Sequence, residues 1–509
     1  MGKKYLIGID SGTSRIKAVL FDLDGNELKS KGLSLIALTP YEDWYEQDMN
    51  EIWEKGFLCI KEVISAVDPK EIAGIGITAQ GDGLWLIDKD GNPVRHGMCF
   101  CDGRTSEIIK TWQEDGTIEK AFDICGTAVF GSAMCAEIRW LEKHEPEALE
   151  KAVAFLHLKD WLFFKLTGEI HCDDTDMFIP MLNARTRKYD ERLFSLFGLD
   201  LYKQKFPVVR AVKENISKIR PEIAEALSLC VDTAIVGGPM DVPACALSCG
   251  VIENGQAMTI IGTAAVHSVA MDRPNIAPRL LGMTMAHCRE DRWLRFMSSL
   301  CGAPNLEWFL ANMGSGLKQE AAERGMDIYE YCSLAIRDIP IGSNGVVYYP
   351  YLLAGGERAP FFKSNIKASF AGISFNTTVK DMLRAVYEGV ALAMVDCYSI
   401  IPTELTEIFV SGGGSGSNTW MQIFADAMAK DIVVCDGREH GARGAAMNCG
   451  VALGLYPDYR AAIDRVVKIK KRYSPNPENQ KKYRELYELY KAGYKMNMDW
   501  WDLRSRFLT

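Results

Sequence analysis

Tyr5-Leu6-Ile7-Gly8-Ile9-Asp10-Ser11-Gly12-Thr13-Ser14 and, half the chain later, Met258-Thr259-Ile260-Ile261-Gly262-Thr263-Ala264 decide the fold. In each stretch a short β-branched run ends in a glycine-threonine loop and a second apolar run follows, which predicts a β-hairpin. Glycine and small hydroxyl residues leave the backbone N–H groups of such a turn open to a phosphate. One loop of this kind is common between ordinary strands, but its repetition favours two phosphate loops that could hold a triphosphate in a cleft.

The first loop carries charged groups that the second lacks. Asp10 ends its first strand and offers an oxygen ligand of the kind that Mg²⁺ prefers, directly or through water. This asymmetry suggests that the two halves arose by duplication and then specialised, so that one binds metal and the other binds phosphate alone. We therefore predict a metal contact at Asp10 and phosphate contacts at Gly12, Thr13, Ser14, Lys17, Gly262 and Thr263.

Length and charge limit the class of protein. A chain of 509 residues is too long for one core, so we expect two domains, residues 1–253 and 254–509, divided within the turn-rich segment 250–257. The net charge of −9 argues against a nucleic-acid or anionic-membrane surface. No stretch has the length of a membrane span and no secretory segment opens the chain, which predicts a cytoplasmic protein without a membrane partner.

Cysteine and histidine provide no metal cage. The 15 cysteines are scattered and form no C-x-x-C pair, and the seven histidines are equally dispersed. We interpret the thiols as reduced core residues of a reducing compartment. A zinc enzyme or a hydrolase with a Ser-His-Asp triad is therefore disfavoured.

Strand-like and helix-like segments alternate along the chain, which predicts an α/β fold. Residues 71–78 and 234–238 have the pattern of strands, whereas 134–144, 381–396 and 419–429 show the three- and four-residue apolar spacing of amphipathic helices. Residues 470–509 are expected to form a terminal helix on the second domain.

Asp241 follows the predicted strand 234–238 through Gly237-Gly238-Pro239-Met240. A carboxylate at a strand end opens into a cleft in α/β folds, and phosphoryl transfer to an alcohol needs a base that accepts the hydroxyl proton. Asp241 fits that role. The alternative is a helix cap, since aspartate before a proline-containing helix start is a frequent N-cap.

The glycine-rich stretch 411–418 lies between a predicted strand and a predicted helix. Such a turn admits a nucleotide close to the backbone and presents helix N–H groups to it, although Gly-Ser turns are often plain connections. We predict nucleotide contacts at Gly412, Gly413, Gly414 and Asn418.

Two polar turns of the first half, 79–83 and 101–104, offer amide, carboxylate and guanidinium groups. Polyols are recognised by such groups because each hydroxyl both donates and accepts a hydrogen bond. Hairpin turn chemistry is the alternative, because Asp-Gly pairs are common in tight turns.

With these motifs in order over its full length, the chain resembles the FGGY family of carbohydrate kinases, relatives of actin and the Hsp70 ATPase. The resemblance rests on 10–13 with Lys17, on 237–241, on 262–263, on Gly355-Gly356-Glu357-Arg358-Ala359-Pro360, on Phe370–Ile373 continuing to Asp381–Glu388, and on 411–414. It implies two RNase H-like domains with an interdomain cleft that closes over ATP, Mg²⁺ and a sugar or polyol. It also implies Asp241 as general base and substrate contacts at Gln80, Asp82, Phe100, Asp102 and Arg104.

The stretch 77–84 resembles the L-xylulose and erythritol kinase branch, where a Gln-Gly-x-Gly pattern occurs. D-xylulose kinases usually carry Met-His in place of Gln80-Gly81, and glycerol kinases carry Gln-Arg-Glu in place of Gln80-Gly81-Asp82. The resemblance therefore favours an L-xylulose-like pentulose or a four-carbon polyol, phosphorylated on a terminal primary hydroxyl.

Two other classes of function share the phosphate loops. An actin- or chaperone-like ATPase switch would need no polar acceptor pocket, and an idle sugar-binding regulator would not retain Asp10, Thr13, Asp241 and Thr263 together. The family is often dimeric or tetrameric, so we expect a homo-oligomer.

Overall fold

The computed structural model describes residues 3–353 and 355–508, which divide into two compact units. The first comprises residues 1–253, 271–294 and 437–467, and the second 254–270, 295–436 and 468–509. A single boundary at 253/254 would assign the segments 271–294 and 437–467 to the second half, but they pack with the first unit. No helix among the described residues is long and apolar enough to cross a membrane.

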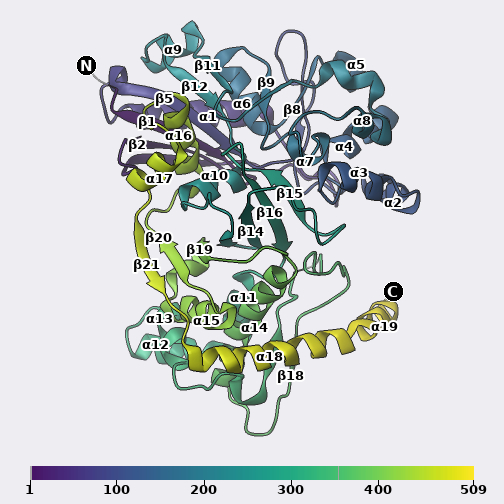
Figure 1. Ribbon diagram of the computed structural model, residues 1–509, viewed down its shortest axis with the longest axis vertical. Coiled ribbons are helices and arrows are strands. Elements are labelled where there is room, and N and C mark those ends of the chain that lie inside the picture. Colours follow the sequence, from purple (N-terminus) through teal and green to yellow (C-terminus); the bar gives the residue numbers. More distant parts are fainter. Residues whose placement is uncertain (1–2, 354, 509) are drawn as a thin grey trace. The chain divides into compact units, whose positions relative to one another are not determined.

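The first unit is built on a six-stranded sheet of order β11-β12-β5-β1-β2-β3 (Figure 1). Its central strand β1 (Tyr5–Ser11) pairs antiparallel with β2 (Arg15–Asp22) and parallel with β5 (Ile72–Ala79). Outside these lie β3 (Glu27–Ser34), β12 (Ala234–Gly237) and β11 (Ile216–Lys218). The inner strands β5 and β12 are buried throughout and apolar because helices cover both faces, whereas the edge strand β3 is polar and mostly exposed.

Alternate residues of β1 enter the two cores of this unit. Ile7 and Ile9 pack with α1 (Met49–Ile64) and α6 (Leu158–Thr167), whereas Leu6 packs with α16 (His440–Ala452) and α17 (Tyr459–Val466). The other elements are β4 (Glu46–Gln47), β6 (Trp85–Ile87), β7 (Gly97–Met98), α2 (Ser106–Glu114), α3 (Thr117–Cys125), α4 (Met134–His144), α5 (Pro146–Lys151), β8 (Ala154–Leu156), β9 (His171–Asp173), α7 (Phe178–Met181), α8 (Glu191–Phe197), β10 (Val208–Arg210), α9 (Pro221–Leu227), α10 (Asp241–Ser248) and β15 (Met283–Ala286).

Glycines explain why the late segment 437–467 belongs to the first unit. A Cβ on Gly8 would lie 1.9 Å from the Ala442 carbonyl oxygen, and one on Gly76 would lie 2.1 Å from that of Ala445. Only strands that lack side chains at these two positions allow α16 to approach the sheet so closely. The sequence shows the glycines but not the helix that they accommodate.

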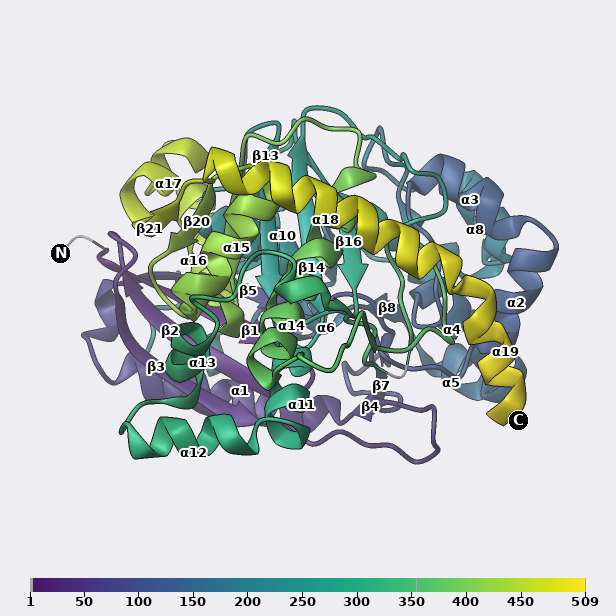
Figure 2. The same ribbon diagram turned by 90° about the horizontal axis from the view of Figure 1, so that it is seen from below.

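The second unit repeats the central arrangement. β13 (Gln256–Ile261) pairs antiparallel with β14 (Ala265–Met271) and parallel with β19 (Glu407–Ser411), which is followed by β20 (Ile432–Cys435) and β21 (Ile469–Tyr473). Its core is formed by α14 (Val379–Ser399), α15 (Asn418–Met428) and α18 (Pro477–Met496), and Figure 2 shows α18 leading into α19 (Met498–Leu508). The remaining elements are β16 (Trp293–Ser299), α11 (Pro304–Asn312), α12 (Ser315–Glu323), α13 (Ile328–Ala335), β17 (Val347–Tyr349) and β18 (Ser369–Ala371).

The predicted elements are found with small shifts at their ends. The helix predicted over 134–144 is α4, and those predicted over 381–396 and 419–429 are α14 and α15. The strands predicted over 71–78 and 234–238 are β5 and β12. The terminal segment differs from its prediction, because it begins with the edge strand β21 and then forms two helices rather than one.

Candidate active site

The loop between β1 and β2 is a tight turn with open backbone donors. The Gly12 N–H donates to the Arg15 carbonyl at 2.9 Å and closes the turn. Within the described part of the chain, the N–H groups of Thr13 and Ser14 make no backbone hydrogen bond. These two free donors are what the sequence predicts for a phosphate contact.

Beside this loop, Asp10, Lys17 and Glu439 form a charged group. Lys17 Nζ lies 3.7 Å from Asp10 Oδ2 and bonds the Glu439 carboxylate. Burial raises the pKa of Asp10, and the nearby Glu439 carboxylate adds to the rise while Lys17 opposes it. Glu439 lies 422 residues from Lys17 in the sequence, so no local pattern identifies it.

The first turn of α16 lies directly against Asp10. A Cβ on Gly441 would lie 2.7 Å from Asp10 Oδ2, so glycine at that position makes room for the carboxylate. Helix N–H groups and a helix N-terminus favour negative charge close by. The fold thus places a carboxylate, an ammonium group and a helix start beside the first phosphate loop.

Asp241 is the first residue of α10, and several bonds hold the turn that precedes it. Met240 N–H donates to Thr175 Oγ1 at 2.9 Å, Asn448 Nδ2 donates to the Gly238 carbonyl at 3.1 Å, and Asn215 Nδ2 donates to the Gly237 carbonyl at 2.8 Å. Asp241 Oδ1 accepts from the Val242 N–H at 2.7 Å, but the N-cap residue of α10 is Met240, so Asp241 does not cap the helix as the alternative interpretation expects. The second oxygen of the half-buried carboxylate remains for another partner.

Asp241 interacts electrostatically with three other carboxyls of the first unit, those of Asp10, Asp82 and Asp176. Burial, together with repulsion from Asp10 and Asp176, raises the pKa of Asp241 to about 7. Burial and the same kind of repulsion raise the pKa of Asp82 to about 8 and that of Asp176 to about 6. Carboxyls with strongly raised pKa values in one place are typical of catalytic sites, where a base must titrate near neutral pH.

Gln80 is joined to the first phosphate loop through Gln47. Its Nε2 donates to Gln47 Oε1 at 2.7 Å, and Gln47 Nε2 donates to the Thr13 carbonyl at 2.7 Å. Gln80 Oε1 is buried without a hydrogen-bond partner among the described residues. An unpaired buried acceptor is costly unless a ligand satisfies it, which suits a substrate hydroxyl.

Asp82 adopts a backbone conformation that is unusual for its residue type. Its φ is 60°, in the left-handed region, and its N–H donates to Asp176 Oδ1 at 3.4 Å. Backbone strain of this kind in a non-glycine residue gathers at functional sites. The glycines on either side are required by space, since a Cβ on Gly81 would lie 2.2 Å from Met240 Sδ and one on Gly83 would lie 2.2 Å from the Met98 carbonyl oxygen.

Asp102 and Arg104 are bound to each other instead of being open. Arg104 donates to Asp102 through Nε at 2.8 Å and Nη2 at 2.7 Å, contacts Glu46 at 2.6 Å, and stacks 3.8 Å over Trp44. Both side chains are fully buried. Phe100, by contrast, is 44% exposed. Direct substrate contact by Asp102 and Arg104 therefore stays a prediction that requires one of these bonds to open.

In the second unit the corresponding turn is enclosed by glycines. Gly262 N–H donates to the Ala264 carbonyl at 3.0 Å, two residues further on, whereas the first loop is closed by a bond from Gly12 to Arg15, three residues further on. A Cβ on Gly302 would lie 2.4 Å from the Gly262 carbonyl oxygen, and one on Gly412 would lie 2.3 Å from that of Ile261. Gly412 has φ +89°, which an L side chain rarely adopts, whereas the space beside Gly413 is open. The predicted loop 412–414 thus touches the strand end that carries Thr263.

Asn418 begins α15, but its side chain is directed to β21. Its Oδ1 accepts from Lys471 Nζ at 2.9 Å and from the Tyr473 hydroxyl. The cap of α15 is instead Ser417, whose Oγ accepts from the Trp420 N–H at 3.2 Å. A nucleotide contact by the Asn418 side chain stays a prediction.

Sequence reasoning missed several residues of this region: Gln47, Lys159, Asp173, Thr175, Asp176, Glu439 and Gly441. The acidic run 173–176 gave a visible signal, because four polar residues stood between apolar segments. Among the described residues no group of three or more His, Cys, Asp and Glu side chains is placed to hold a metal ion.

Comparison with known proteins agrees with this arrangement. Two family models, the N-terminal and C-terminal domains of the FGGY family of carbohydrate kinases, match residues 5–248 and 257–453. The chain belongs to this family. It is accordingly an ATP-dependent carbohydrate kinase with a small-molecule sugar substrate, and the fold predicted from the sequence is confirmed.

Individual relatives of this carbohydrate kinase are named for different substrates. A probable L-xylulose kinase of Pasteurella multocida is 29% identical over 96% of this chain and 97% of its own length. Erythritol kinase of Brucella abortus is 27% identical over 98% and 97%. The crystal structure of a xylulose kinase from Lactobacillus acidophilus superposes with a TM-score of 0.89 at 23% identity, covering 97% of this chain and 98% of that one.

Proposed function

We propose that this carbohydrate kinase phosphorylates a terminal primary hydroxyl of an L-xylulose-like pentulose, with Asp241 as general base. The observation that supports it is the carboxyl cluster around Asp241, whose pKa of about 7 lets it accept a proton near neutral pH. Asp241 would orient the hydroxyl and take its proton as the oxygen attacks phosphorus. The bonds to Gly237, Gly238 and Met240 fix the carboxylate for that purpose.

ATP and Mg²⁺ suit the donor groups that are present. The free N–H groups of the Thr13 loop and the glycine-lined Thr263 loop would bind phosphate oxygens, and the open space at Gly413 would admit the adenosine. Asp10 would hold Mg²⁺, which usually takes one or two carboxylates and completes its shell with water and phosphate. When bound, the metal neutralises charge on the transferring phosphoryl group. Lys17 supplies a further positive charge at Asp10.

The acceptor pocket would be formed by Gln80, Asp82 and Asp176. Two of their buried oxygens, Gln80 Oε1 and Asp82 Oδ1, have no hydrogen-bond partner among the described residues and would meet sugar hydroxyls, whereas Asp176 Oδ2 lies 3.7 Å from Lys159 Nζ. A relative named L-xylulose kinase and one named erythritol kinase agree with the pattern at 80–83. A four-carbon polyol is the second candidate, because the same acceptors serve any small polyhydroxylated substrate.

An acceptor panel tests this proposal. We expect MgATP-dependent ADP release to be stimulated by L-xylulose or erythritol with kcat/KM at least tenfold above D-xylulose, L- and D-ribulose, D-threitol, glycerol and gluconate, as hydrogen-bonded sites discriminate hydroxyls strongly. A higher kcat/KM with any other sugar would replace the substrate assignment. Equal ADP release with and without every acceptor would instead support a nucleotide switch.

The pKa of Asp241 predicts how kcat/KM depends on pH. The base works only when ionised, and its pKa is raised, so kcat/KM is expected to fall as pH drops through about 7. Because the Asp176 charge contributes to that rise, Asp176→Asn should move the acidic limb to lower pH. A limb near the ordinary aspartate value in the unmodified enzyme would contradict the assignment. The measurement is kcat/KM for the best acceptor between pH 5 and 9.

The cellular setting is proposed on sequence grounds alone. The 15 cysteines, all within the described residues, form no disulfide, which suits a reducing compartment, and we propose a cytoplasmic location. A homo-oligomer remains a prediction, which light scattering of the purified protein would check.

A further inference from the structure

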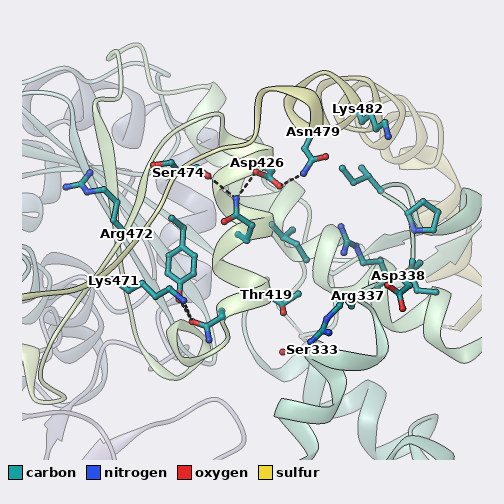
Figure 3. A pocket seen from close by; sticks show the side chains of 18 residues that line it. Ser333, Arg337, Asp338, Thr419, Asp426, Lys471, Arg472, Ser474, Asn479 and Lys482 are labelled. Atoms are coloured by element: carbon teal, nitrogen blue, oxygen red, sulfur yellow. Dashed lines mark hydrogen bonds between the residues drawn. The ribbon is translucent and has the colours of Figure 1, made fainter.

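A pocket of about 740 Å³ in the second unit does not gather its charged groups on one ligand. It lies beside α15, β21 and the start of α18, and Figure 3 shows Lys482 and Arg337 at its opposite ends. Two further cations of its lining, Arg384 and Arg472, are paired with carboxylates of their own. A surface of a different kind lies at the other end of α18, where that helix leads into α19 (Figure 2).

One face of α19 is fixed to the second unit. Trp501 is buried, and Asp502 Oδ1 accepts from Asn365 Nδ2 at 2.7 Å and pairs with Lys363. The Trp501 N–H donates to the Asn497 carbonyl at 3.2 Å, which connects α19 to the end of α18. These contacts determine which face of α19 is directed outward.

The opposite face of α19 is apolar and exposed. Met496, the last residue of α18, is 83% exposed, and Trp500, Leu503 and Phe507 are 52%, 61% and 87% exposed. The four residues follow one another at intervals of four, three and four, so their side chains form one stripe along the helix. This is the spacing of the a and d positions of a coiled coil. A continuous apolar stripe on a soluble protein marks an interaction surface.

The charges beside this stripe are self-complementary. Asp499 and Arg506 are seven residues apart and lie on the same flank of α19, so that flank is acidic near its start and basic near its end. When two copies of α19 pack antiparallel, Asp499 of each helix lies opposite Arg506 of the other. Opposite charges at these flanking positions set the partner and the orientation of paired helices.

The apolar residues fit the same antiparallel register. Met496 of one helix meets Phe507 of the other, and Trp500 meets Leu503, because an antiparallel pair matches residues that lie equally far from its centre. Each aromatic ring then packs against a smaller side chain, as facing positions of a well-filled contact do. A parallel pair would place each aromatic ring against its own copy. The stripe and its flank therefore suit a second α19.

The size of the stripe indicates how strong this contact is. At these exposures its four side chains present on the order of 600 Å² of surface, less than the roughly 800 Å² per partner that a standard protein interface buries. Interfaces at the small end of the range are usually weak and reversible. We therefore expect monomers and dimers in equilibrium.

We propose that the exposed stripe of α19 is a self-association surface on which a second copy of this chain packs its own α19 antiparallel. The stripe contains none of the residues of the candidate active site. The dimer contact is therefore independent of the acceptor and of the base assigned above.

Sedimentation velocity of the unmodified protein from low to high micromolar concentration tests this contact. We expect a monomer that converts into a dimer as concentration rises. Leu503→Glu/Phe507→Glu places charge in the stripe and should weaken association at least tenfold, because a buried charge without a partner is costly. The matched control is Phe375→Glu/Val379→Glu, which replaces one exposed aromatic and one exposed aliphatic residue of the same unit and should leave association unchanged.

A charge swap tests the register. Asp499→Arg should weaken association about threefold or more at low salt, because two like-charged pairs replace two opposite ones. Adding Arg506→Asp restores opposite charges only in the antiparallel register, so the double variant should associate as the unmodified protein does. Thermal unfolding of every variant checks that α19 still packs through Trp501.

Four results would overturn the proposal. They are a monomer at every concentration, association that resists Leu503→Glu/Phe507→Glu, equal weakening by the control variant, and no rescue by the charge swap. A monomer that sediments with vesicles of phosphatidylcholine and phosphatidylglycerol would assign the stripe to a membrane surface instead. ADP release with the best acceptor is measured separately, so failure of the dimer contact leaves the kinase assignment untouched.

Discussion

Asp241→Ala is expected to lower kcat for the best acceptor by about 100-fold or more, the usual effect of removing a general base. ATP binding should change little, because the phosphate loops that carry Thr13 and Thr263 keep their own hydrogen bonds. The rate of ADP release with and without acceptor measures kcat, and fluorescence titration with an ATP analogue measures ATP binding.

Stability gives a second readout for the same variant. Burial and the neighbouring carboxylates raise the pKa of Asp241, so its ionised form is disfavoured in the folded protein. Removing this carboxylate should leave the free energy of unfolding at pH 8 unchanged or raise it, because a functional group whose ionised form is unfavourable in the folded protein lowers its stability. Asp232→Ala, an exposed aspartate of the same unit, is the matched control for both measurements. Turnover of Asp241→Ala near that of the control would remove Asp241 from the chemistry.

The two phosphate loops and the position of Asp241 could be predicted because each depends on a short segment of the sequence. The two glycine-threonine turns follow strands whose apolar runs are plain, and Asp241 follows a buried strand through two glycines and a proline. Turn chemistry and strand periodicity are local properties, so a single sequence reveals them. For the same reason α4, α14 and α15 are found close to their predicted ends.

The parts that could not be predicted depend on chain segments that meet only after folding. Glu439 reaches Lys17 because α16 packs on β1 and β5, and that packing depends on Gly8 and Gly76, which in the sequence look like ordinary strand glycines. The bond from Met240 to Thr175 likewise joins two loops 65 residues apart. Asp102 and Arg104 show the opposite case, because their types suggest a ligand site while their geometry pairs them with each other.

Lys159→Met is expected to lower the free energy of unfolding more than any other substitution proposed for this protein. Lys159 Nζ lies 2.7 Å from Asp160 Oδ1 and 3.7 Å from Asp176 Oδ2 and bonds Asp173, and all four side chains are fully buried. Methionine keeps the approximate length of lysine but removes the only ammonium group that this acidic cluster contacts among the described residues. Removing one partner of a buried ion pair lowers the free energy of unfolding by about 3–5 kcal/mol, because the remaining charges stay buried without compensation. Urea unfolding measures this difference.

The pH dependence of that loss distinguishes the charge from simple packing. Lys159 holds the pKa of Asp160 below its usual value in spite of burial. Without the ammonium group the buried carboxyls take raised pKa values, so the folded state binds more protons than the unfolded one and its stability falls as pH rises. The gap between Lys159→Met and the unmodified protein should therefore be wider at pH 8 than at pH 5. Lys151→Met, on the exposed end of α5, should stay within about 0.5 kcal/mol at both values. A Lys159→Met gap that is the same at both pH values would show that lost packing, and not the buried charge, accounts for the effect.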